Sequence, residues 1–153
     1  MIGRRVMWKR CAGAMALSAI VLGSACRATP PENSLGQQWL DALNSHDTAR
    51  VAALLNPDAT YSDPTTKEPL GVVPLSERWI REWTQWKDRV YTAKSILSTA
   101  DTVVIEWHLQ QIHPSGKAVP LDGVTILDRD GMHIRAVRDY YNPAVYLQFL
   151  RPQ

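Results

Sequence analysis

Cysteine is almost absent from this 153-residue chain: Cys11 and Cys26 are the only two, and both lie near the N-terminus. The region that follows has no disulfide available, so its stability must come from a hydrophobic core. The four histidines show no spacing typical of metal ligands, and no later cysteine can complete such a site. A glycine-rich phosphate loop and a nucleophile motif are also missing. We therefore expect a domain that works without a metal or another cofactor.

Acidic residues are missing from the first 31 positions, which carry five basic side chains. The remaining residues hold 12 basic and 15 acidic side chains, a net charge of −3. An acidic domain lacks the basic surface on which nucleic-acid binding depends. We therefore expect no nucleic-acid partner.

The N-terminal residues show the order of charges and apolar residues found in export signals. A basic stretch precedes an apolar run from Cys11 to Gly23, and the small residues Gly23-Ser24-Ala25 end it. The run is shorter than the roughly 20 residues that a membrane-spanning helix needs. We predict that residues 1–25 are a signal segment, 26–31 a tether and 32–153 a single domain.

Two features leave the export route and the destination open. The run Arg4–Lys9 resembles a twin-arginine signal with Gly3 in place of the usual serine or threonine, and ordinary secretion is the alternative. Cys26 stands where a bacterial lipoprotein carries its lipid, although Gly23 replaces the usual leucine. The domain is thus expected outside the cytoplasm, either bound to the membrane through a lipid on Cys26 or released into the periplasm or the medium.

Apolar residues recur at three- and four-residue spacing in three segments of the first half, which predicts three helices. The first begins at Ser34 and ends before Asp47, the second covers residues 51–55, and the third begins at Pro74. The third helix has one apolar stripe, formed by Leu75, Trp79, Trp83 and Trp86. We expect this stripe to be buried.

From Val90 onward, apolar and polar residues alternate, which predicts β-strands. Turn sequences separate four such segments, at residues 91–97, 102–113, 117–127 and 132–141. A short strand at residues 59–63 precedes them, and a short helix at 144–150 follows. Helices followed by a meander of long strands predict the α+β class, with the helices packed on one face of a curved antiparallel sheet.

Four short motifs follow one another along the predicted domain. They are residues 39–47, 54–64, Asp130-Gly131 and 137–141. In this order they resemble the nuclear transport factor 2-like superfamily, and within it the SnoaL-like and ketosteroid-isomerase-like proteins. The resemblance implies a cone in which a bent antiparallel sheet and three helices enclose an apolar pocket, often in a homodimer. It does not imply one activity, because the fold hosts many.

The resemblance also implies a pair of catalytic carboxylates. Asp63 stands where ketosteroid isomerases have their general base, and Asp122 stands where they have a protonated aspartic acid. The first carboxylate moves a proton beside a carbonyl, and the second donates a hydrogen bond to the developing oxyanion. Asp63 is alternatively a cap for its loop. Asp122 shares a strand face with Val124 and Ile126, so it is either buried in the pocket or solvated at its mouth.

Trp39 and Asp139 are further candidates from the same resemblance. Trp39 replaces the tyrosine that donates the second oxyanion hydrogen bond, and losing such a donor commonly costs about 10²–10³ in rate. SnoaL-like cyclases have an acid that shuttles a proton at the place of Asp139, which shares a strand face with Val137 and Tyr141. A structural role, with Asp139 hydrogen-bonded to a tyrosine or tryptophan, is equally compatible.

Aromatic residues are the candidates for the pocket wall. They are Trp39, Trp79, Trp83, Trp107 and Tyr141. Such a wall suits a flat apolar small molecule, and the same residues otherwise form a core or a dimer interface. The sequence thus favours an exported pocket domain, either a cofactor-free isomerase or cyclase or a carrier. The competing hypothesis is a non-catalytic interaction module tethered at the membrane.

Overall fold

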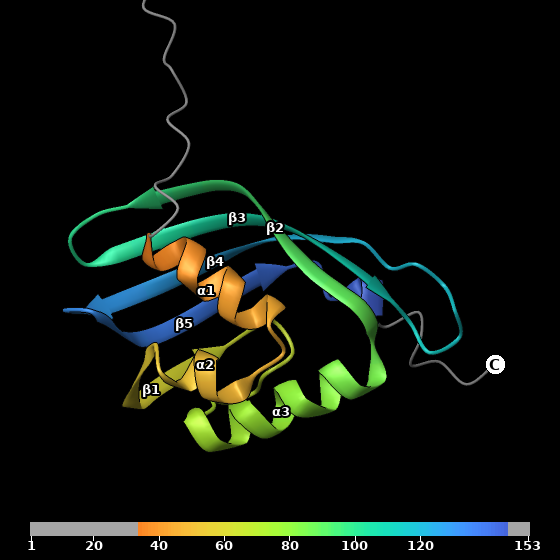
Figure 1. Ribbon diagram of the computed structural model, residues 1–153, viewed down its shortest axis with the longest axis horizontal. Coiled ribbons are helices and arrows are strands. Elements are labelled where there is room, and N and C mark those ends of the chain that lie inside the picture. Colours follow the sequence, from red (N-terminus) through yellow and green to blue (C-terminus); the bar gives the residue numbers. More distant parts are fainter. Residues whose placement is uncertain (1–33, 147–153) are drawn as a thin grey trace, which may run out of the picture.

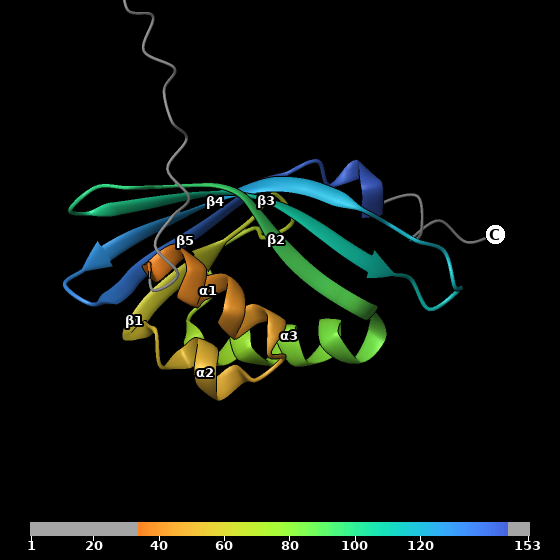
Figure 2. The same ribbon diagram turned by 45° about the horizontal axis from the view of Figure 1, so that its top comes forward.

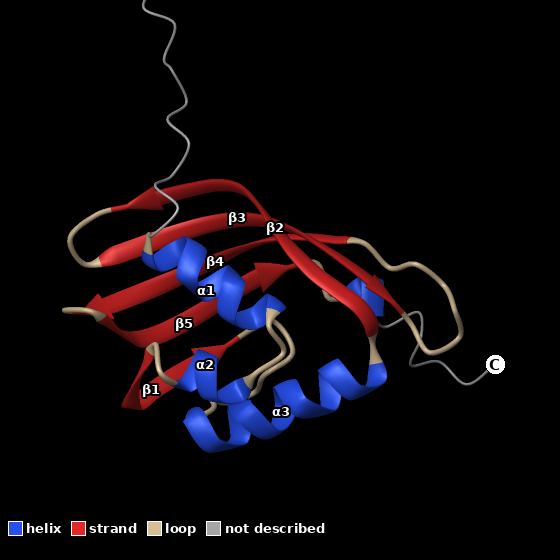
Figure 3. Ribbon diagram, in the orientation of Figure 1, coloured by secondary structure: helices blue, strands red, loops and turns tan. Residues whose placement is uncertain are grey.

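The computed structural model describes residues 34–146, in which three helices cover one face of a five-stranded sheet (Figures 1 and 3). The elements are α1 (Leu35–Asn44), α2 (Thr48–Ala52), β1 (Leu55–Ser62), α3 (Val72–Gln85), β2 (Lys87–Ser98), β3 (Thr102–Ile112), β4 (Leu121–Asp130) and β5 (His133–Tyr141). This is the predicted α+β class. The predicted signal segment, the tether and Cys26 lie outside the described residues. Within the described part, no helix is long and apolar enough to cross a membrane.

Local side chains set where the helices begin. The Ser34 side chain accepts a hydrogen bond from the backbone N–H of Gln37 at 3.2 Å and caps α1. Asp47 caps α2 in the same way through the N–H of Ala49, at 2.8 Å. Helix α3 begins at Val72, two residues before the predicted start, because Pro74 is tolerated anywhere in a first turn whose N–H groups have no helical partner.

The strand order is β1-β5-β4-β3-β2. Strands β2 to β5 form the predicted antiparallel meander, but β1 pairs with β5 in parallel, with Tyr61 opposite Val137. The antiparallel meander is confirmed, and the one departure from the predicted antiparallel sheet is the parallel edge pair of β1 with β5, which makes the sheet mixed. Strand β1 also begins before residue 59, at Leu55. Its register shifts between Leu55 and Thr60, so Pro57, which has no N–H to donate, lies in a bulge of an edge strand.

The sheet bends over the helices and encloses the core between the two layers (Figure 2). The inner face of the sheet contributes Ile105, Leu127 and Ile134, which are fully buried against residues of α1 such as Leu40. Gly123 is required on this face, because a Cβ there would lie 2.3 Å from the ring of Trp107. The glycine makes room for an indole that a side chain would displace.

The apolar stripe of α3 is buried at its first half only. Leu75 and Trp79 are buried, as predicted, whereas Trp83 and Trp86 are half-buried. Trp83 stacks on Trp79 and on His46. Because the second half of the stripe is not covered by the core, α3 leaves space between itself and the sheet.

Candidate functional site

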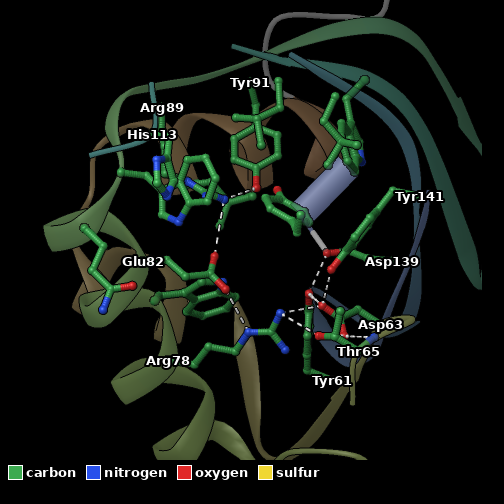
Figure 4. A pocket seen from close by; sticks show the side chains of 18 of the residues that line it. Tyr61, Asp63, Thr65, Arg78, Glu82, Arg89, Tyr91, His113, Asp139 and Tyr141 are labelled. Carbon is green, nitrogen blue, oxygen red and sulfur yellow. Dashed lines mark hydrogen bonds and ion pairs between the residues drawn. The ribbon is translucent and has the colours of Figure 1, made fainter. Parts of the chain in front are cut away.

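A cavity of about 370 Å³ lies between α1, α3 and the inner face of the sheet (Figure 4). Four of the five predicted wall residues line it: Trp39, Trp79, Trp107 and Tyr141. The fifth, Trp83, does not line it, because its ring is stacked against His46. The size lies in the range typical of sites for small molecules.

Asp63 lies at the end of β1 and lines the cavity, as predicted. Its Oδ1 accepts hydrogen bonds from the backbone N–H groups of Thr65 (2.8 Å) and Thr66 (2.9 Å), and from the Thr65 hydroxyl (2.8 Å). Its Oδ2 accepts from Arg78 Nη2 at 2.5 Å and from the Tyr141 hydroxyl at 2.7 Å. The carboxylate therefore caps its loop and is also anchored from α3 and β5.

These contacts fix the charge of Asp63. Burial of the carboxyl opposes ionisation, but the hydrogen bonds from Arg78 and Tyr141 and the charge of Arg78 outweigh it and lower the pKa of Asp63 to about 2. A carboxylate with so low a pKa, and with donors on both oxygens, is a weak base near neutral pH. Asp63 is better suited to hold its neighbours than to take a proton.

Asp139 lies on β5, on the same strand face as Val137 and Tyr141, and lines the cavity. Its Oδ2 accepts a hydrogen bond from the Tyr61 hydroxyl at 2.9 Å, and its Oδ1 accepts one from the Thr125 hydroxyl at 2.5 Å. The Tyr61 hydroxyl also lies 3.3 Å from Asp63 Oδ2, so it bridges the two carboxylates.

The surroundings of Asp139 shift its ionisation in the direction opposite to that of Asp63. Burial raises the pKa of Asp139 to about 6, although the hydrogen bonds from Thr125 and Tyr61 act to lower it; the negative charge of Asp63 raises it further. A cavity-lining carboxyl with this pKa can both accept and return a proton near neutral pH.

Asp122 does not reach the cavity. It shares a strand face with Val124 and Ile126, as predicted, but that face points away from the helices, so the expectation of a pocket carboxyl is wrong. The Asp122 side chain is 63% exposed and pairs with Lys94 Nζ (2.7 Å) and His108 Nδ1 (2.8 Å), whose hydrogen bonds lower its pKa. Successive side chains of a strand point to opposite faces of the sheet. Because Leu121 and Leu127 face the core, Asp122 lies on the outer face.

A second polar group lies across the cavity. We call Arg89, Tyr91, Gln111 and Tyr146 the Arg89 cluster. Arg89 Nη1 donates to Gln111 Oε1 at 2.8 Å, and Arg89 Nη2 donates to the Tyr91 hydroxyl at 2.9 Å. Gln111 Nε2 donates to the Tyr146 hydroxyl at 3.0 Å. Arg89 is only 5% exposed, so a charged group is buried in the cavity wall.

Glu82 joins the two ends of the site. Its carboxylate accepts from Arg78 Nε at 2.9 Å and lies 3.3 Å from Arg89 Nη2. The wall therefore contains two guanidinium groups and three carboxyl groups, those of Asp63, Glu82 and Asp139.

Residues 37–137 match the SnoaL-like domain family. The chain belongs to this family.

Solved structures show the same fold. A protein with a ketosteroid isomerase-like fold from Catenulispora acidiphila, in complex with trimethylamine, aligns with a TM-score of 0.69 and 20% identity over 78% of this chain and 95% of its own. A candidate hydroxylase, AclR from Streptomyces galilaeus, aligns with a TM-score of 0.67 and 18% identity, over 76% of this chain and 92% of its own. A candidate polyketide cyclase from Xanthomonas campestris aligns with a TM-score of 0.62 and 20% identity, over 76% of this chain and 94% of its own. No curated protein matches the sequence.

Several site residues of the SnoaL-like domain were missed by the sequence analysis, although the patterns contain a signal for them. Gln111 lies an even number of positions from Trp107 on β3, and Arg89 lies two positions from Tyr91 on β2, so each pair shares a strand face. Arg78 and Glu82 fall at helical spacing from Leu75 and Trp79, on the inner side of α3. A charged residue or an amide at a core-facing position is therefore the signal that identifies them.

Trp39, the predicted replacement for the oxyanion tyrosine, lies deeply buried at the cavity wall. It is 1% exposed and lines the cavity, and its indole N–H has no hydrogen-bond partner within the described residues. Among residues 34–146, histidine, cysteine, aspartate and glutamate form no group of three that could hold a metal ion. The site is thus a set of protein donors and acids around an aromatic space.

Proposed function

We propose that this SnoaL-like domain is a cofactor-free acid–base enzyme, an isomerase or a cyclase, that acts on an apolar carbonyl compound. The observation that carries the proposal is Asp139, a half-buried residue in the wall of an aromatic cavity whose carboxyl has a pKa of about 6. General acid–base catalysis is most efficient when the catalytic pKa lies near the working pH.

Asp139 is the proposed proton carrier in place of Asp63. As a carboxylate it takes a proton from a carbon next to the carbonyl, and as an acid it returns the proton to another position of the product. Tyr61 and Thr125 each donate a hydrogen bond to one of its oxygens and so fix its orientation. The Thr125 hydroxyl is itself held, because it accepts from the Trp107 indole N–H at 2.8 Å.

Asp63 and Arg78 act as positioning residues in this scheme. Asp63 keeps a permanent negative charge near Asp139, which raises the pKa of the catalytic carboxyl, and the positive charge of Arg78 partly offsets this effect. Asp63 also holds the hydroxyl of Tyr141 beside the cavity. The pair therefore tunes the acid without exchanging protons itself.

The cavity walls support an apolar, flat substrate. Trp79 meets Trp39 edge-to-face with ring centroids 5.8 Å apart, and Trp107 meets Tyr91 in the same manner at 5.4 Å. Rings packed in this way present apolar surface to a ligand and keep water from the reacting atoms. The candidate polyketide cyclase from Xanthomonas campestris supports this class of substrate.

We further propose that the domain acts outside the cytoplasm. The order of basic, apolar and small residues before residue 26 supports export, and the position of Cys26 supports a lipid anchor. Because both lie outside the described residues, the proposal rests on the sequence alone. A non-catalytic carrier or interaction module is the alternative, and the proton-transfer experiment below separates it from an enzyme.

The experiment uses 2-tetralone, a flat bicyclic ketone whose α-protons exchange with solvent. We expect the full-length chain in D₂O to accelerate this exchange, measured by proton NMR, over the same concentration of acetate. The rate should rise with pH through about 6 and then level, because the ionised form of Asp139 is the base. Exchange no faster than with acetate would favour the carrier, and a rate independent of pH would exclude Asp139 as the base.

A further inference from the structure

At the Asp139 end of the cavity, the hydroxyl groups donate their protons to carboxylates of the protein. The Tyr141 hydroxyl donates to Asp63 at 2.7 Å, and the Tyr61 hydroxyl donates to Asp139 at 2.9 Å. The Thr125 hydroxyl donates to the other oxygen of Asp139. At this end of the site, acceptors on the protein take up the hydroxyl donors.

In the Arg89 cluster, the hydroxyl groups accept hydrogen bonds instead of donating them. The Tyr91 hydroxyl accepts from Arg89, and the Tyr146 hydroxyl accepts from Gln111. A phenol that accepts a hydrogen bond still has its own O–H to donate. Among residues 34–146, the Tyr91 and Tyr146 hydroxyls take part only in these two hydrogen bonds, in which each accepts, and both residues line the cavity. Because both phenols lie at the cavity wall, a bound molecule with a hydrogen-bond acceptor can receive their O–H protons.

The charges of the wall define what kind of acceptor fits. Arg89 is already paired with Glu82, and the carboxyls of Asp63 and Asp139 line the same cavity. Two guanidinium groups face three carboxyl groups, so another anion would be repelled rather than attracted. A neutral oxygen, such as that of a ketone, meets the donors without adding charge.

We infer that the Arg89 cluster is a donor subsite that binds a ketone oxygen of the substrate. Figure 4 shows Arg89 and Tyr91 on the opposite side of the cavity from Asp63 and Asp139, so a bound ketone lies between the hydrogen-bond donors and the proton carrier. The subsite also supplies oxyanion donors in place of Asp122, which lies outside the cavity. This inference deepens the proposed function, but binding at the subsite needs no proton transfer.

The test compares three probes of similar size: tetralin, which has no oxygen, 2-tetralone and 2-naphthoate. Their affinities are measured by calorimetry on the full-length Asp139→Asn variant, so that no turnover occurs. We expect 2-tetralone to bind about tenfold more tightly than tetralin, and 2-naphthoate to bind more weakly than 2-tetralone. Tyr91→Phe and Tyr146→Phe, added singly, should each lower the ketone affinity by about three- to tenfold, the value of one hydrogen bond, and leave tetralin binding unchanged.

Tyr140→Phe is the matched control, because Tyr140 is 53% exposed and does not line the cavity. It should alter no affinity. The inference is overturned if 2-tetralone fails to bind more tightly than tetralin, if both cavity variants keep the wild-type preference, or if 2-naphthoate binds best. A selective ketone site without proton exchange in the wild type would instead leave the subsite intact and remove the proposed catalysis.

Discussion

Replacing Asp139 with asparagine is expected to slow α-proton exchange of 2-tetralone by about 10²–10⁴-fold, the usual contribution of a general acid–base group. Asparagine keeps the size of the side chain and can still bond Tyr61 and Thr125, but it cannot take up a proton near pH 7. The matched variant is Asp122→Asn, which removes an exposed carboxylate outside the cavity. It should exchange at the wild-type rate. Equal rates in all three proteins would remove Asp139 from the mechanism.

The same substitution should also change stability with pH in a direction that an aspartate of ordinary pKa would not show. The folded-state pKa of Asp139 is about 6 against 3.8 for an ordinary aspartate, so the native state binds the proton more tightly than the unfolded chain. The stability of the wild type therefore falls as pH rises from about 4 to 6 and beyond. Relative to wild type, Asp139→Asn should gain about 1 kcal/mol between pH 5 and pH 7, measured by urea unfolding. A constant difference would contradict the raised pKa.

Replacing Asp63 with asparagine is expected to destabilise the domain by about 3–5 kcal/mol, because it leaves the guanidinium of Arg78 without its buried partner. The Asp63 side chain is fully buried in this pair, and that of Arg78 is 19% exposed. The control is Asp128→Asn, which breaks the more exposed pair with Arg138 on the outer face and should cost about 0–1 kcal/mol. Urea unfolding at pH 7 measures both.

The stabilisation that Asp63 supplies depends on pH. The folded pKa of Asp63 is about 2, below the ordinary 3.8, so its stabilisation is present above about pH 4 and is lost as pH falls through about 2. The difference in free energy of unfolding between wild type and Asp63→Asn should therefore become smaller as the pH falls from about 4 to about 2. If Asp63→Asn were as mild as Asp128→Asn at pH 7, the ion pair with Arg78 would not be the anchor of the site.

The fold was predictable because periodicity alone separates the helices from the meander. The direction of β1 was not, because its parallel pairing with β5 joins segments about 75 residues apart, and no local pattern encodes it. Asp122 shows a related limit. Alternation places it correctly beside Val124 and Ile126, but which face of a strand meets the core depends on the whole sheet.

The polar site was only partly predictable. Asp63, Asp139 and Tyr141 were placed in the pocket by the family resemblance, and all three line the cavity. Their charges were not predictable, because the pKa of Asp63 depends on Arg78 from α3 and that of Asp139 on burial against β1 and β4. The proposed exchange of roles between the two aspartates therefore rests on tertiary contacts.

The titration of the Asp139 carboxyl is the most direct test of the central claim. Carbon-13 NMR of aspartate carboxyls follows it, with the signal assigned by its loss in Asp139→Asn. We expect a midpoint near pH 6 for Asp139, with Asp63 still ionised well below pH 4. A midpoint for Asp139 near the ordinary 3.8 would contradict the assignment of this residue as the proton carrier.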